Sequence, residues 1–301
     1  MAKTREIKKR IKAVANIRRI TKTMQMIATS KFARAQQRAL ATKPYTEGIF
    51  ELVRELAATA GNLTHPLIAG PGTGAGEQAR ELTLVITSDR GLCGPYNGAV
   101  LRAAMALFRE NARARGGLIE LVGKKGAGFL RFNHLPLARQ HTLGDKPTFE
   151  QVERIAQAYI DRFSAGELSA VRVVYMRFHS IGRQRPEVLQ LLPLKPPPRA
   201  SAAAGTEGEP GTRGVALEYE FSPDADELLN DLLPATVKAT LFQCFNDALV
   251  SEHIARMVAM KAATDNAGKM GKRYTRLYNR ARQAQITTEL TEIVNGAAAL
   301  N

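Results

Sequence analysis

The sequence has no tryptophan, only two cysteines and no run of eighteen consecutive apolar residues. Cys93 and Cys244 lie far apart and outside any CxxC motif, so we expect neither a disulfide framework nor a bound metal. The missing apolar run argues against a transmembrane helix, and the opening MAKTREIKKRIKAV lacks the apolar core of a secretory signal. These absences predict a protein of a reducing compartment, soluble or peripheral to a membrane.

Acidic residues are almost missing from the N-terminal segment. Residues 1–45 contain thirteen Lys or Arg and one acid, Glu6, in a chain of net charge +15. Apolar residues recur there at spacings of three and four, which predicts an amphipathic helix. They are Ile7, Ile11, Val14, Ile17, Ile20, Met24 and Ile27. Because like charges repel, so basic a helix is expected to bind an acidic partner, whether nucleic acid, an anionic membrane or an acidic protein.

Helix-breaking residues are rare at both ends of the chain. No Gly or Pro precedes Pro44, which predicts a helix of about 40 residues that residues 45–60 could extend. No proline follows Pro234, so a second helix is expected from there to Asn301, on the order of 90 Å long. Its two stripes are Met270, Tyr274, Leu277, Ala281, Ala284, Thr288 and Thr291, and Ile286, Leu290, Ile293 and Ala297. A compact domain cannot bury such a rod, so the terminal helices are expected to form a coiled coil, irregular between Val14 and Ile20, where the apolar spacing drifts.

The middle of the chain alternates strands with helices, which predicts an α/β fold class with a largely parallel, Rossmann-like sheet. Strands are expected at 82–88, 118–123, 171–180, 188–194 and 215–221, and helices at about 98–114, after Gly123 and at 148–163. Residues 69–78 and 195–214 have the composition of loops, and Ser222-Pro223 could begin the last helix. The predicted parts are an N-terminal helix (1–60), an α/β domain (80–195), a linker (196–214), and a last strand with the C-terminal helix (215–301).

No catalytic constellation is evident in the sequence. SDRGLCGPYN (88–97) follows a predicted strand, but it contains neither GxxxxGK[ST] nor GxGxxG, so a tight strand-to-helix connection is the preferred interpretation. GKKGAGF (123–129) is interpreted as a solvated loop. Cys93 lies beside Asp89 and Arg90 without a paired His or Cys. The five histidines, His65, His134, His141, His179 and His253, share no metal-binding spacing. We therefore expect no cofactor and no catalytic residue.

Three segments closely resemble the gamma subunit of F-type ATP synthases. They are IKKRIKAVANIRRITKTMQMIATSKFARAQ, SDRGLCGPYN, and the C-terminal SEHIARMVAMKAATDNAGKM with YNRARQAQITTELTEIVNGAAAL. The resemblance implies an antiparallel, left-handed coiled-coil shaft whose C-terminal end lies inside a ring of three alpha and three beta subunits. It also implies that the α/β domain is a foot which sits, with the epsilon subunit, on the membrane c-ring. Such a chain transmits torque as a non-catalytic subunit of the proton-transporting two-sector ATPase, while nucleotide chemistry belongs to the beta subunits.

The resemblance also assigns contacts to individual residues. It places Met24 and Arg256 near one another at an acidic loop of the beta subunits, and Arg282 and Gln283 at a loop higher in the ring. Further basic candidates are Lys9, Arg10, Lys22 and Lys31, and the sliding tip of the shaft is formed by Gly296, Ala297, Ala298, Ala299 and Leu300. Met24 could equally be core of the coil, and several lysines could simply be solvated.

The sequence departs from the family pattern at Pro95-Tyr96, where the family commonly has Gly and an apolar residue. Its cysteines do not match the regulatory pair of chloroplast members, so thiol gating is not expected. Together with the missing targeting segment, this favours the cytoplasmic face of a bacterial inner membrane. Two alternatives remain open: a basic coiled-coil protein with salt-sensitive nucleic-acid binding, and an α/β enzyme whose region 80–220 binds a nucleotide cofactor.

Overall fold

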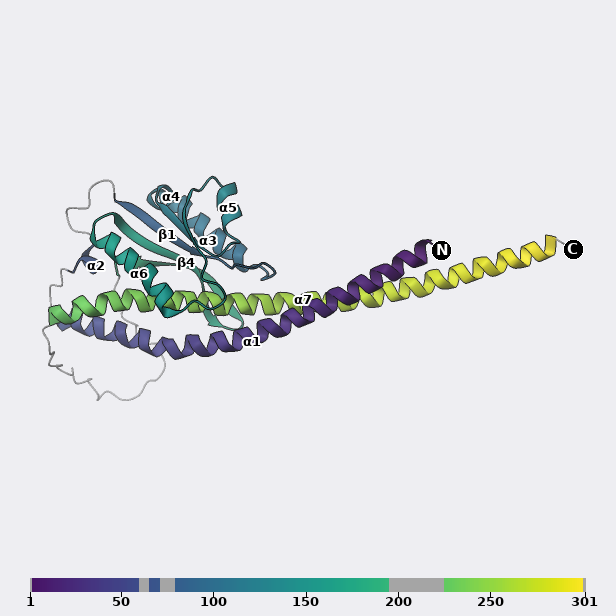
Figure 1. Ribbon diagram of the computed structural model, residues 1–301, viewed down its shortest axis with the longest axis horizontal. Coiled ribbons are helices and arrows are strands. Elements are labelled where there is room, and N and C mark those ends of the chain that lie inside the picture. The colour runs from purple at the N-terminus through teal and green to yellow at the C-terminus, as the bar shows by residue number, and fades with distance from the viewer. Residues whose placement is uncertain (1, 60–64, 71–78, 195–224, 300–301) are drawn as a thin grey trace, which may run out of the picture. The chain divides into compact units, whose positions relative to one another are not determined.

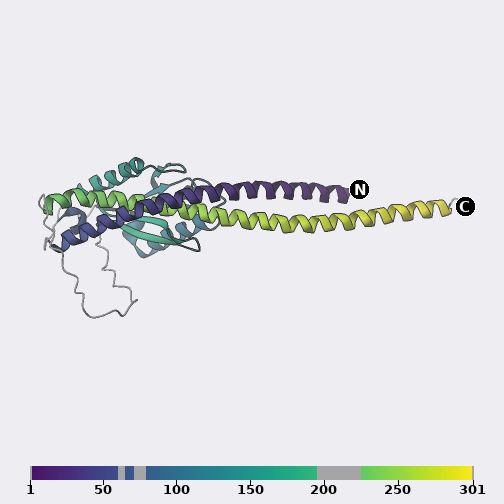
Figure 2. The same ribbon diagram turned by 90° about the horizontal axis from the view of Figure 1, so that it is seen from below.

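The computed structural model describes residues 2–59, 65–70, 79–194 and 225–299 (Figures 1 and 2). The chain forms two compact units. Unit 1 comprises Met1–Ala33, Leu92–Gly94 and His253–Asn301, and unit 2 comprises Arg34–Gly91 and Pro95–Glu252. The predicted linker 196–214, the predicted strand 215–221, the Ser222-Pro223 helix start and Leu300 lie outside the described residues, as does most of the predicted loop 69–78.

Two helices, α1 (Ala2–Thr59) and α7 (Ala225–Ala299), supply residues to both units. Each contains an interior proline: Pro44 lies inside α1, which continues to Thr59, and Pro234 lies inside α7, which begins at Ala225. An interior proline removes one backbone hydrogen bond and costs about 3 kcal/mol. Packing on either side of Pro234 offsets this cost, since Leu233 and Val237 are fully buried. Burial of the flanking turns therefore explains why α7 begins earlier than Pro234.

Within the described residues, the sheet has five strands in the order β3-β2-β1-β4-β5. The strands are β1 (Arg80–Ile86), β2 (Leu118–Val122), β3 (Leu137–His141), β4 (Leu168–Ser180) and β5 (Arg183–Leu192). Neighbouring pairs among β1 to β4 are parallel, and β5 alone runs antiparallel to β4. The prediction of a largely parallel sheet is thus confirmed. Strand β3 was not predicted because it lies at an edge, where its middle residues, Ala138, Arg139 and Gln140, are exposed and carry no apolar pattern.

Helices cover both faces of this sheet (Figure 1). They are α2 (Pro66–Ala69), α3 (Tyr96–Glu110), α4 (Ala112–Gly116), α5 (Ala127–Phe132) and α6 (Phe149–Ser164). On one face, α6 and the first part of α7 share a core with β1 and β4, in which Tyr159, Phe163 and Leu241 are almost completely buried. The buried side of α3, with Val100, packs on the other face. None of the described helices is long and apolar enough to cross a bilayer.

A buried carboxylate ties the edge strand β3 into the sheet. The Nε2 atom of His141 lies 2.6 Å from Oε2 of Glu120, and the Tyr159 hydroxyl donates to the same oxygen over 2.7 Å. Burial alone would raise the pKa of Glu120, but these two hydrogen bonds and the charges of His141 and Arg162 outweigh burial and hold that pKa below its ordinary value. The cluster joins β2, β3 and α6 and is structural in character.

Candidate partner-binding surface of the paired terminal helices

In unit 1, α1 and α7 pack against each other in an antiparallel register. The Thr4 hydroxyl donates to Oε1 of Gln285 over 3.1 Å, and the Thr264 hydroxyl donates to that of Thr21 over 2.9 Å. Residue numbers therefore fall along α7 as they rise along α1, which fixes the antiparallel direction. Figure 2 shows the two helices side by side.

The seam between the helices alternates spacings of three and four without interruption. On α1 its positions are Thr4, Ile7, Ile11, Val14, Arg18, Thr21, Gln25, Ala28 and Phe32, and on α7 they are Met257, Met260, Thr264, Ala267, Gly271, Tyr274, Tyr278, Ala281 and Gln285. All of them except Arg18 are buried or half-buried. This spacing is the heptad pattern typical of left-handed coiled coils. The predicted pairing of the terminal helices is confirmed.

The apolar stripe of α1 does not follow this seam throughout. Ile17, Ile20 and Ile27 are 52%, 56% and 51% exposed, although they were expected to face α7. The seam keeps its period by accepting Arg18, whose Nε lies 3.7 Å from the position that a Cβ on Gly268 would occupy. Small α7 residues make room for a long side chain, so the drift in the apolar pattern moves isoleucines to the surface.

The predicted stripe of α7 was only partly correct. Tyr274 and Ala281 lie in the seam, but Met270, Leu277 and Ala284 are exposed. The seam uses Gly271, close to Val14, and Tyr278 in their place. Glycine was not counted as a seam residue in the sequence because it carries no apolar side chain, although its small size allows close approach of α1.

The proposed contact residues are distributed along unit 1. Met24, Arg256 and Lys31 are half-buried, and Lys9, Arg10, Lys22, Arg282 and Gln283 are exposed. Arg10 has partners within the chain: its Nη2 lies 2.6 Å from Oε1 of Glu6. The hydrogen bonds that its guanidinium donates to Tyr274 and to Glu6 raise the pKa of Arg10. Arg10 is therefore less available to another chain than Lys9 or Lys22.

The last part of α7 extends beyond the described pairing with α1. Every side chain from Ile286 to Ala298 is exposed, and residues 286–299 correspond to about 21 Å of helix. The stripe of Ile286, Leu290 and Ile293 lies on this segment, next to the tip residues Gly296, Ala297 and Ala298. Ala299 ends the helix. A long exposed apolar stripe of this kind marks a surface that another protein covers.

The loop after β1 uses its hydrogen-bonding groups internally. Oδ1 of Asn97 accepts from the Ser88 N–H over 3.0 Å, and Oγ1 of Thr87 accepts from the Gly126 N–H over 3.2 Å. A phosphate at this end of the sheet would need such donors to be available. Pro95 is the N-cap residue of α3 and the Tyr96 ring is buried, so the departure from the family pattern fits a regular helix start. The loop is thus a strand-to-helix connection.

Residues 92–94 of the same loop pack on α7 within unit 1, which the sequence did not reveal. Gly94 has φ +56°, and a Cβ there would lie 3.5 Å from the Cβ of Ala259 and 3.7 Å from the carbonyl oxygen of Ala255. The glycine and the small α7 residues together permit this close approach. Cys93 is buried here, so it is not an accessible nucleophile.

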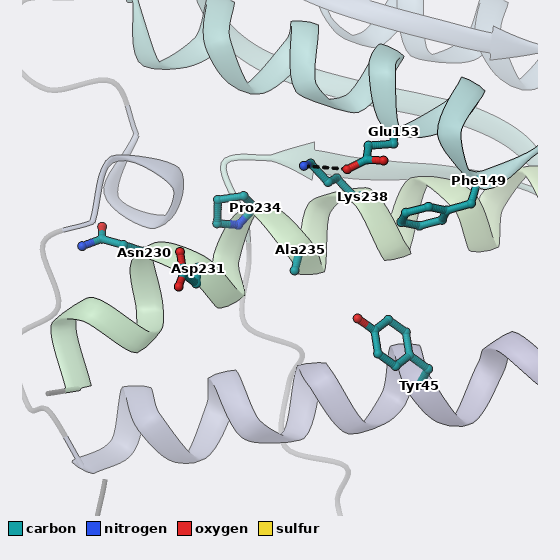
Figure 3. Close-up of a pocket in the computed structure, with 8 residues that line it drawn as sticks. All are labelled: Tyr45, Phe149, Glu153, Asn230, Asp231, Pro234, Ala235 and Lys238. Carbon is teal, nitrogen blue, oxygen red and sulfur yellow. Dashed lines mark hydrogen bonds and ion pairs between the residues drawn. The ribbon is translucent and has the colours of Figure 1, made fainter. Parts of the chain in front are cut away.

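A hollow of about 300 Å³ lies between α1, α6 and α7 in unit 2 (Figure 3). Its lining residues are Tyr45, Phe149, Glu153, Asn230, Asp231, Pro234, Ala235 and Lys238. Nζ of Lys238 lies 3.0 Å from Oε1 of Glu153, so these two charges neutralise each other. Among the described residues, no group of three or more His, Cys, Asp or Glu could hold a metal ion. The hollow has no residue set that indicates catalysis.

Comparisons with known proteins cover the whole chain. The family model described as ATP synthase matches residues 3–300. The ATP synthase gamma chain of Rhodopirellula baltica is 39% identical, and the match covers 100% of this chain and 99% of that one. The ATP synthase gamma chain of Methylibium petroleiphilum is 40% identical, and the match covers 100% of both chains. A chain in the rotor of Euglena gracilis mitochondrial ATP synthase has a TM-score of 0.63 at 18% identity, with 95% of this chain and 99% of that chain covered. The last match concerns the fold alone.

Proposed function

Because the chain belongs to the ATP synthase gamma chain family, we propose that it is the central rotor shaft of a proton-translocating F-type ATP synthase. In this role it couples rotation of a membrane c-ring to conformational change, and so to ATP synthesis or hydrolysis, at sites on the beta subunits. The observation that carries the proposal is the full-length match to gamma chains, over a chain whose terminal helices pair in strict heptads. The chain itself contributes no catalytic group.

The physical form of unit 1 supports this role. A two-helix coiled coil resists bending and twisting far better than a single helix. Past Gln285, α7 continues as a segment with an exposed apolar stripe and a tip of small, uncharged residues. Small residues at the tip, Gly296 to Ala298, would allow it to turn inside a ring of partners. We propose three alpha and three beta subunits as that ring, with the epsilon subunit and the c-ring as the other partners.

Charge on the shaft supplies a means of coupling. The exposed lysines Lys9 and Lys22 and the exposed pair Arg282 and Gln283 can meet acidic or polar loops of the beta subunits. Arginine suits such contacts because its planar guanidinium binds a carboxylate through two hydrogen bonds. We propose the cytoplasmic face of a bacterial inner membrane as the location, which fits the peripheral attachment of this rotor.

The nucleic-acid alternative loses its main support. It rested on twelve excess positive charges in residues 1–45, and the same charges are explained by acidic loops on partner subunits. The full-length family match favours the rotor over that alternative and over a nucleotide enzyme.

Native mass spectrometry of the complex isolated through an affinity tag on this chain tests the proposal. The expected mass contains one copy of this chain with three alpha and three beta subunits. A homodimer, or an adduct with nucleic acid that lacks those subunits, would contradict it.

Replacing Met24 by lysine is expected to weaken coupling. Met24 is half-buried on α1, and Arg256 is half-buried on the facing helix. A lysine ammonium at position 24 would add a positive charge to the part of the shaft that carries Arg256, and like charges repel more strongly where solvent is excluded. We expect ATP made per proton to fall while the complex still assembles. Met24→Leu, which keeps the volume without charge, is the control, and equal coupling in the lysine variant would contradict the assigned position.

A further inference from the structure

Asp247 is a buried carboxylate that the rotor function does not use. It lies on α7 within unit 2 and is 8% exposed. Nε2 of Gln243 donates to its Oδ1 over 2.9 Å, and a backbone hydrogen bond from Phe178, near the end of β4, reaches the same carboxylate. Both partners are neutral, and no ion pair joins Asp247 to any residue in the part of the chain that the structure describes.

The same turn of α7 is hydrogen-bonded to α1. The Thr42 hydroxyl donates to Oε1 of Gln243 over 3.3 Å, and Nδ2 of Asn246 donates to the oxygen of Thr42 over 3.3 Å. Gln243 therefore connects Thr42 on one side with Asp247 on the other. The network runs from α1 through α7 to β4, and its only ionisable member is Asp247.

The charged and titratable groups around Asp247 do not neutralise it. From β4 and β5, Arg177 and Glu187 face this region, but Nη1 of Arg177 is bound to the Glu187 carboxylate over 2.9 Å. Tyr175 on β4 and Cys244 on α7 are both buried, and burial raises both of their pKa values, so both stay neutral. From α1, the residue that is hydrogen-bonded to this turn is Thr42, which does not titrate.

A carboxylate in this setting resists ionisation. Burial disfavours its charged form, and neutral hydrogen-bond donors compensate only in part. Burial raises the pKa of Asp247 to about 6, against the opposing effects of the Gln243 hydrogen bond and the Arg177 charge. An aspartate exposed to water has a pKa of about 3.9.

We propose that Asp247 is a proton-binding site that controls how firmly α7 is held against the end of β4. With the proton bound, the carboxyl group is neutral and the contact carries no buried charge. Without the proton, the carboxylate is an anion that has no ion-pair partner and is buried whenever α7 packs against the end of β4. Because the folded-state pKa lies above the value in water, the contact strengthens as pH falls through about 6 and is weaker above that pH.

A proton-binding site at Asp247 would give the rotor a property beyond torque transmission. One consequence rests on the proposed function. In a rotor that turns with proton flow, the pH around α7 would change how firmly α7 is held against the end of β4. The proton-binding site itself does not require that function, because it depends only on groups within unit 2.

Hydrogen exchange of the purified full-length chain tests the proposal. Protection factors, corrected for the intrinsic effect of pH on exchange, are measured by mass spectrometry for peptides covering residues 176–178 and 243–251. The wild-type chain is expected to gain about tenfold in protection between pH 7.5 and pH 5.0, from a pKa of about 6 in the closed contact. Wild-type protection that does not change over this range would overturn the proposal without any variant and without bearing on the rotor function.

Two variants assign the effect to one carboxylate. Asp247→Asn keeps the shape and removes the charge, so its protection should be constant with pH and near the wild-type value at pH 5.0. Asp231→Asn, at an exposed carboxylate of the same helix, should retain the wild-type dependence. A tenfold pH dependence that persists in Asp247→Asn would place the proton elsewhere and contradict the assignment.

Discussion

Gly123→Ala is expected to prevent stable folding of unit 2. Gly123 follows β2 with φ +85°, a backbone conformation that alanine adopts at a cost of roughly 1–2 kcal/mol. A Cβ there would also lie 2.3 Å from the carbonyl oxygen of Thr87 and 2.9 Å from that of Ser88. These are backbone atoms of a connection held by hydrogen bonds, so they cannot move aside cheaply. We expect a loss of about 4–5 kcal/mol or more, at the extreme of single substitutions.

Thermal unfolding followed by circular dichroism measures this effect, with Gly128→Ala as the matched control. Gly128 lies in α5, nothing lies within 4 Å of a Cβ there, and alanine is the better helix former by about 1 kcal/mol. The control should melt at the wild-type temperature or slightly above it. A Gly123→Ala protein that melts within a few degrees of wild type would show that the β2 connection relaxes more easily than this geometry allows.

The elements with strong periodicity could be predicted from the sequence. Strands β1 and β4 contain the apolar-rich segments LTLVI and VVYM, and α6 carries an amphipathic pattern that begins at its capping residue Thr148. β3 was missed because an exposed edge strand needs no apolar residues. The sequence left open whether α1 continues past Pro44 and whether α7 begins before Pro234. Both do, because tertiary packing outweighs the local preference of proline, which sequence spacing does not report.

The partner-binding surface was predicted less completely than the fold. The existence of the coiled coil followed from the spacing of Ile7, Ile11 and Val14, all of which lie in the seam. The helix face that continues the seam depends on the sizes of the side chains that meet between α1 and α7. The pairing of Gly268 with Arg18 is an example, because it joins two parts of the chain that are distant in sequence. The same holds for Gly94 against Ala259, since no local pattern links a loop after β1 to the middle of α7.

Arg282→Ala is expected to slow coupled turnover about tenfold while assembly stays largely intact. Arg282 is exposed on α7, close to the point where the described pairing with α1 ends, and it makes no hydrogen bond or ion pair with a described residue. Its guanidinium can therefore be used fully by a partner. A hydrogen bond to a charged group contributes about 1.5–3 kcal/mol, and each 1.4 kcal/mol added to a barrier slows a step about tenfold.

The substitution should lower the rate of ATP synthesis and leave the subunit composition of the complex unchanged, because the seam residues beside Arg282 are unchanged. Arg280→Ala is the matched control: it removes another exposed arginine from the same helix, two residues away and therefore on a different face. Proton-driven ATP synthesis is measured in vesicles containing complexes of equal subunit content. If both variants synthesise ATP at the parent rate, Arg282 makes no contact that carries force. If both are slowed equally, total positive charge on this part of α7 matters, and the specific bidentate contact with a beta-subunit loop is wrong.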